Sequence, residues 1–247
     1  MPTIPRSHLR RFWLVIGTLA LAPGLMAEAG QSPDPRRFEK DIAAFEAEDR
    51  AAPPPAGSTL FVGSSSIRYW DVAKAFPTRS TIKRGFGGSH VSDNVYYADR
   101  IIVRYKPALI VFYAGDADVA AGKTAEQIAA DVKTLIALIH ERLPGTTMVI
   151  IGTKPSPAHW AHIDTIRRAN RLVKALVAND PLAAYADVDD ALVGSDGHPR
   201  PDFYAENGLN LNERGYEAWT AAVRPVIDRL GPGTIGPDLT QLLPAMQ

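Results

Sequence analysis

Short apolar runs alternate with longer segments of helical periodicity along most of this chain, and no other feature constrains the fold more. The runs at 60–63, 81–84, 108–112, 148–152 and 184–188 have the length and the glycine, proline or polar boundaries of buried strands. The segments between them are long enough to return the chain for another parallel strand. We therefore expect an α/β fold, a three-layer α/β/α sandwich with a doubly wound, five-stranded parallel sheet.

Helical periodicity predicts the elements that cover this sheet. The clearest helix starts at a capping box formed by Thr124 and Gln127 and ends before Pro144. Further helices are expected over 93–105, 163–177 and 213–230, the last with Asn212 as its N-cap.

Four segments of different character follow one another along the chain. Residues 1–27 read as a signal peptide, because arginines precede an apolar stretch and small residues follow it near Ala27. That stretch of about 15 residues is shorter than the roughly 20 needed to span a bilayer, so no stable membrane span is expected after cleavage. Residues 28–57 are expected to form a linker and an outer N-terminal helix, 58–230 the α/β domain and 231–247 a loose tail. The protein is thus expected to be exported, to a bacterial periplasm or beyond.

The balance of charge limits the partners. Lys plus Arg and Asp plus Glu number 27 each, so no basic field attracts nucleic acid, and a small or neutral ligand is expected. Cysteine is absent, and no phosphate loop, nucleotide fingerprint or metal motif is present, so no cofactor or metal is expected. The sequence does not indicate an oligomeric state.

Loops at the carboxyl ends of parallel strands are where such a sheet binds ligands. The loop after the first expected strand contains Ser65 within three consecutive serines, and the loop after the second contains Gly88 in a glycine-rich turn. The third spans 113–118, and the fourth, 206–212, precedes the last helix. Taken singly, the three serines are also consistent with a helix cap, and the glycine-rich loop is equally consistent with a tight turn.

Together, these four segments resemble the SGNH (GDSL-type) hydrolase family, over about residues 60–230. The resemblance implies a flavodoxin-like sandwich in which Ser65 is the nucleophile and Gly88 donates a backbone N–H to the oxyanion hole. In the same alignment Ala117 occupies the position of the oxyanion-hole Asn. Asn207 and Asn210 occupy the positions of the catalytic Asp and His.

These three replacements remove the groups that make a serine react. An unassisted hydroxyl is a poor nucleophile near neutral pH, and an Asn amide does not take up its proton. The leading hypothesis is therefore a catalytically disabled member of the family, which keeps its scaffold and binds an acyl or acetylated-carbohydrate ligand.

Two alternatives stay open at this point. One is an active serine esterase that uses a substitute base, with His90 as the first candidate and His159 and His162 as others near the site. The other is an active hydrolase silenced by deliberate substitution. Restoring the family's Asn, Asp and His would test whether the rest of the site is sound.

Overall fold

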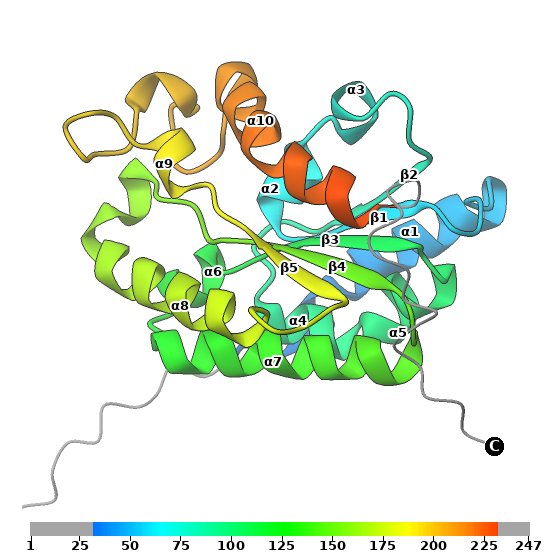
Figure 1. Ribbon diagram of the computed structural model, residues 1–247. Helices are drawn as coiled ribbons and strands as arrows, with labels where there is room; N and C mark the ends of the chain where they lie inside the picture. The colour runs from blue at the N-terminus through cyan, green and yellow to red at the C-terminus, as the bar shows by residue number, and fades with distance from the viewer. Residues whose placement is uncertain (1–31, 232–247) are drawn as a thin grey trace, which may run out of the picture.

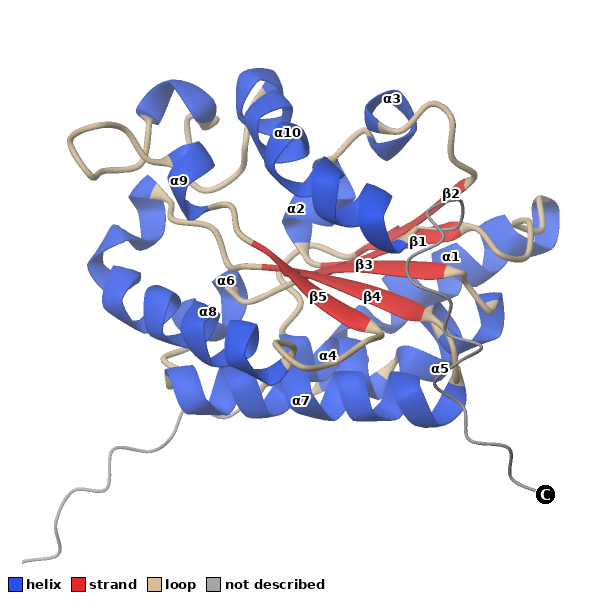
Figure 2. Ribbon diagram, viewed as in Figure 1, coloured by secondary structure: helices blue, strands red, loops and turns tan. Residues whose placement is uncertain are grey.

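The computed structural model describes residues 32–231, and it confirms the expected α/β sandwich (Figure 1). Five parallel strands form one sheet in the order β2-β1-β3-β4-β5, shown in red in Figure 2. Their bounds are β1 Thr59–Gly63, β2 Thr81–Gly85, β3 Leu109–Tyr113, β4 Thr147–Ile151 and β5 Ala183–Ala186. The chain order reverses at β1, which places the ends of β1 and β3 at the centre of the carboxyl edge.

Helices cover both faces of the sheet (Figure 1). One face carries α1 (Glu39–Ala51), α4 (Val91–Tyr96), α5 (Ala98–Ile101), α7 (Ala125–Arg142) and α8 (Ile163–Leu176). The other carries α2 (Ser65–Tyr69), α3 (Val72–Ala75), α9 (Asp189–Leu192) and α10 (Glu213–Leu230). The short α6 (Asp116–Ala120) leads from β3 toward α7, and 3-10 turns lie at η1 Pro35–Phe38, η2 Val103–Tyr105, η3 Pro157–His162 and η4 Pro201–Phe203.

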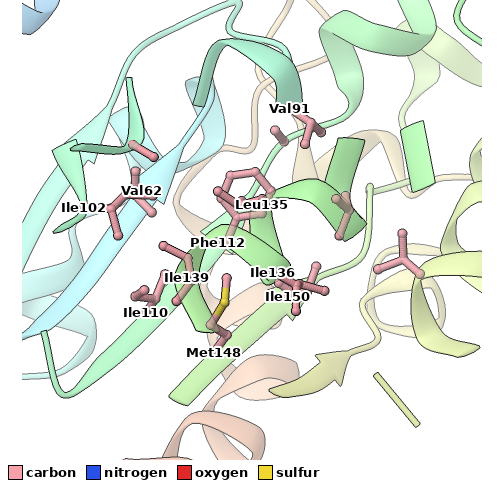
Figure 3. Packing of buried hydrophobic residues seen from close by; sticks show 14 of the residues in the cluster. Val62, Val91, Ile102, Ile110, Phe112, Leu135, Ile136, Ile139, Met148 and Ile150 are labelled. Atoms are coloured by element: carbon pink, nitrogen blue, oxygen red, sulfur yellow. The ribbon is translucent and has the colours of Figure 1, made fainter. Parts of the chain in front are cut away.

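Side chains of the central strands alternate between two apolar cores, as the pleat requires. Val62 and Phe112 enter the core shared with α7, where Leu135 and Ile139 meet them (Figure 3). The intervening strand residues, such as Phe61, enter the second core with α10. A sheet buried on both faces explains why its strands read as continuous apolar runs.

The predicted helix caps are confirmed. Thr124 and Gln127 form the reciprocal capping box of α7, with hydrogen bonds of 3.2 and 2.8 Å. The Asn212 side chain accepts the Gly215 N–H at 3.0 Å and caps α10.

The single helix expected over 93–105 is wrong, because the structure divides this stretch into α4, α5 and η2. Ile102 interrupts the helix with φ −130° and ψ −65°. Consecutive β-branched residues at 101–103 have low helix propensity, and Ile101 and Ile102 are both fully buried in the core. Packing therefore overrides the helical pattern at this point.

The N-terminal helix is attached to the sheet by a buried ion pair. Asp49 on α1 binds the Arg84 guanidinium of β2, and Tyr105 donates to the same carboxylate at 2.6 Å. Both charged side chains are less than a tenth exposed. Ile42 of α1 is also fully buried, so this helix forms part of the core.

The predicted signal peptide and residues 232–247 of the predicted tail lie outside the described residues. Between residues 32 and 231, no helix has the length and hydropathy needed to cross a membrane.

We predict that Asp49→Ala lowers the free energy of unfolding by about 3 kcal/mol, because it leaves the buried Arg84 guanidinium without its counter-charge. Urea unfolding at neutral pH measures the change. Glu48→Ala is the matched control: Glu48 lies 3.7 Å from Arg84 but its side chain is 65% exposed, so its removal should cost little. Equal and small losses in the two variants would contradict this account of the ion pair.

Candidate active site

Ser65 begins α2 directly after β1, where the chain turns sharply. The Ser64 N–H donates to the Tyr113 carbonyl at 2.9 Å, which ties this turn to the end of β3. Gly63 has φ +139°, and a side chain there would collide with the same carbonyl. Ser65 is partly exposed, whereas Ser64 and Ser66 are buried. The turn therefore presents one serine of the three to solvent.

The glycine-rich loop lies beside this serine. A Cβ built on Gly87 would be 3.8 Å from the Ser65 Cβ. Gly88, the expected oxyanion-hole donor, is exposed and has φ +79°, a left-handed conformation that favours glycine. The structure thus brings the first and second predicted loops together.

Ala117 occupies the first turn of α6 and is partly exposed. A methyl group has no N–H to donate, so this side chain cannot stabilise an oxyanion. The acidic residues on either side of it, Asp116 and Asp118, are buried and make contacts of their own.

Asn207 and Asn210 lie in one turn before α10. The Asn207 Oδ1 accepts the N–H groups of Leu209 and Asn210, both at 3.0 Å. The Asn210 Oδ1 is buried without a hydrogen-bond partner among the described residues. Asn207 therefore maintains the shape of the turn through backbone contacts, and no hydrogen bond links the two side chains.

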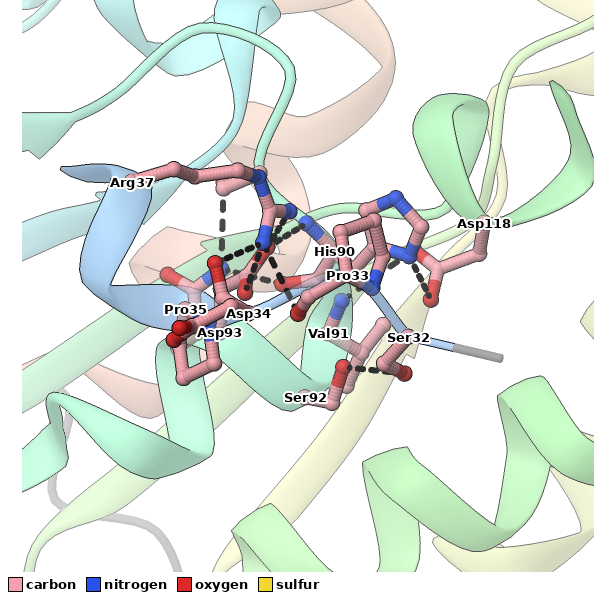
Figure 4. Close-up of polar contacts among 12 residues, drawn as sticks. Ser32, Pro33, Asp34, Pro35, Arg37, His90, Val91, Ser92, Asp93 and Asp118 are labelled. Atoms are coloured by element: carbon pink, nitrogen blue, oxygen red, sulfur yellow. Dashed lines mark hydrogen bonds and ion pairs between the residues drawn. The ribbon is translucent and has the colours of Figure 1, made fainter. Parts of the chain in front are cut away.

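His90, the first candidate for a substitute base, is buried beneath the glycine-rich loop at 4% exposure. Its Nδ1 lies 3.6 Å from Asp118 Oδ1, in a polar cluster that also includes Asp93 and Arg37 (Figure 4). Burial lowers the pKa of His90, with Asp118 opposing the shift and Lys123 adding to it. These contacts hold the loop next to Gly88 in place. They indicate a structural role for His90.

A buried ionic network at the ends of β3 and β4 was not singled out from the sequence. Lys154 is fully buried and donates to Asp116 Oδ2 at 2.7 Å and to the Tyr113 hydroxyl at 3.1 Å. The Tyr113 hydroxyl donates to the same carboxylate at 2.7 Å, and burial raises the pKa of Tyr113 well above its ordinary value. Lys154 lies between apolar β4 and two prolines, a position where an ionic role leaves no distinctive pattern in the sequence.

His159 lies closer to this network than the other candidate bases do. Its Nδ1 is 3.9 Å from Asp116 Oδ1, and neither atom has a hydrogen-bond partner in the described structure. Burial lowers the pKa of His159, and nearby Lys154 adds to the shift while Asp116 opposes it. The neighbouring Ala158 N–H donates to the Gly208 carbonyl at 3.1 Å, so this loop packs against the Asn207–Asn210 turn. His162 is exposed.

No histidine or carboxylate is hydrogen-bonded to the Ser65 hydroxyl within residues 32–231. In the same part of the chain, no three His, Cys, Asp or Glu residues cluster so that they could hold a metal ion. The arrangement can position a ligand beside Ser65 and offer it backbone N–H groups. It places no proton acceptor on the serine.

Residues 59–218 match the model of the GDSL-like lipase/acylhydrolase family. Human platelet-activating factor acetylhydrolase IB subunit alpha1 is 26% identical over 181 residues, which cover 69% of this chain and 75% of that protein.

Two solved structures share the fold. A GDSL-like lipase from Bacteroides thetaiotaomicron has a TM-score of 0.65 at 17% identity, covering 76% of this chain and 97% of that one. A catalytic mutant of an acetylxylan esterase from Geobacillus stearothermophilus has a TM-score of 0.56 at 13% identity, covering 71% and 95%. At such low identity these likenesses establish the fold, and the chemistry rests on the residues of the site itself.

Proposed function

The chain belongs to the GDSL-like lipase/acylhydrolase family, as its loop motifs predict, and from this premise we propose that it binds an acyl or acetylated-carbohydrate ligand without hydrolysing it. The observation that carries the proposal is the Ser65 hydroxyl, which lacks a hydrogen-bonded base among the described residues. The accessible serine and the adjacent Gly88 loop support ligand binding. Asn207 and Asn210 support the absence of turnover, because an amide side chain does not take up the serine proton.

The expected loss of rate is large. Removing the base or the nucleophile of a serine hydrolase costs about 10⁶ in kcat in a well-studied protease. Removing one side-chain oxyanion donor, as Ala117 does, costs about 10² to 10³. The losses do not add once the base is gone, so only weak residual catalysis from binding and backbone N–H groups is expected.

The names of the relatives support an ester as the group that is bound. The human relative is named for hydrolysis of an acetyl group, and the Geobacillus neighbour is named for acetylxylan. An acetyl ester is the substrate feature these two names share. We infer that the site at Ser65 accommodates such a small acyl group.

A second candidate function is slow ester hydrolysis with a substitute base. The approach of His159 to Asp116 favours His159 for that role, because a carboxylate beside Nδ1 would orient the imidazole. His90 is disfavoured because it is only 4% exposed, whereas His159 is partly exposed.

We predict no turnover of short-chain nitrophenyl esters by the protein as it stands. The combined variant Ala117→Asn, Asn207→Asp and Asn210→His should raise kcat by at least about 10³, because it restores the base, its orienting carboxylate and an oxyanion donor. Steady-state kinetics of the two proteins measure the difference.

The same variant with Ser65→Ala is the control and should be inert. Turnover by the unmodified protein that disappears in His159→Ala and persists in His162→Ala would overturn the proposal in favour of the second candidate. His162 is the matched control because it lies on the same turn but is exposed.

We also propose export, from the charge and hydropathy pattern of residues 1–27. Expression of the whole chain in a bacterial host should yield a periplasmic or secreted protein that begins near residue 28. N-terminal sequencing of the mature protein measures this. An intact Met1 on cytoplasmic protein would contradict it.

A further inference from the structure

A groove of about 800 Å³ lies between α2, α3 and α10. Asn210 and Tyr216 are among its lining residues, and the Tyr216 hydroxyl is hydrogen-bonded to the Ser66 carbonyl, so the groove adjoins the serine turn. The volume falls within the range of about 300 to 1,000 Å³ that is typical of small-molecule sites. The position and the size together suit the larger portion of a ligand whose ester lies beside Ser65.

Three aromatic residues, Tyr69, Trp70 and Tyr216, form part of the apolar wall of the groove. Trp70 and Tyr216 stack at 6.3 Å between ring centroids, with an interplanar angle of 13°. Their polar atoms are bound elsewhere: the Trp70 indole donates to Thr220 at 3.1 Å, and the Tyr216 hydroxyl donates to the Ser66 carbonyl at 2.9 Å. Tyr69 lies on the rim and is 57% exposed. Leu211 is the one large aliphatic side chain among the lining residues of this groove.

Among the polar side chains that line the groove, carboxylates outnumber cations. Lys74 is paired with Glu213 at 2.8 Å, and Arg224 donates to the Ala75 carbonyl at 2.6 Å. Glu217 and Asp71 add two exposed carboxylates to the rim. Because the carboxylates outnumber the cations and both cations have partners, the groove does not suit an anionic headgroup.

We propose that this groove binds a neutral oligosaccharide, with one sugar ring stacked on Tyr69 and its hydroxyls donating to the rim carboxylates. A pyranose ring has an apolar C–H face and a hydroxyl edge, which match an exposed aromatic ring beside carboxylates. A fatty acyl chain has no hydroxyl groups, so along the groove it would cover the rim carboxylates without giving them hydrogen-bond donors. The inference builds on the proposed function by assigning the carbohydrate portion of the bound ester to this groove.

The test is calorimetric titration with neutral oligosaccharides of xylose, glucose and N-acetylglucosamine that carry no O-acetyl groups. These probes carry no O-acyl ester for a serine to cleave, so their binding is independent of whether Ser65 reacts. At least one should bind, and Tyr69→Ala should weaken it about tenfold, the equivalent of losing one aromatic contact of about 1.4 kcal/mol. Tyr69→Phe should keep the affinity within about twofold, because the ring face is retained.

Tyr96→Ala is the matched control, since Tyr96 is 58% exposed but lies on α4, away from the groove. It should leave oligosaccharide affinity unchanged. Titration with decanoate tests the competing occupant. Absence of binding by every oligosaccharide, equal effects of the two alanine variants, or decanoate binding that is lost in Tyr69→Ala would overturn the proposal. Ester turnover, measured separately on the same preparation, reports on the proposed function alone.

Discussion

The fully buried ammonium of Lys154 joins the ends of β3 and β4. It binds Asp116, which follows β3, and it also contacts the Tyr113 hydroxyl at the end of β3. The Tyr113 carbonyl in turn accepts the Ser64 N–H, so the serine turn after β1 is tied to the same point. A charge buried this completely is tolerated only when its partner is fixed, and breaking such a pair is costly. The position of Ser65 therefore depends on this network and does not require a catalytic histidine.

Under the proposed function, that separation between scaffold and chemistry lets the fold keep its geometry without the family's reactive groups. The Asn207 side chain still shapes the turn before α10 through two backbone N–H groups. The carboxamide of Asn210, whose Oδ1 is buried, lies in that turn, but it has no capacity to accept the serine proton. Electrostatic preorganisation and proton transfer are different contributions to catalysis, and the proposed function assigns the protein part of the first and none of the second.

The fold was predictable from sequence because both faces of its sheet are buried, which makes every strand an apolar run. The caps at Thr124 and Asn212 were predictable because a side chain bonds to its own local backbone. The break at Ile102 was not, since it depends on packing against distant residues. The site loops were identified from motifs, but the Lys154 network and the burial of His90 depend on contacts made across the sheet. The assignments of Ser65, Gly88, Ala117, Asn207 and Asn210 to catalytic positions stay predictions.

Labelling with a fluorophosphonate probe followed by intact-protein mass spectrometry reports most directly on whether the Ser65 hydroxyl is activated. A fluorophosphonate forms a stable adduct only with a serine whose proton is being withdrawn as it attacks. The account predicts an unchanged mass for this protein, even after long incubation at neutral pH. An adduct located at Ser65 would show that a base acts on this hydroxyl after all, and it would contradict the central claim.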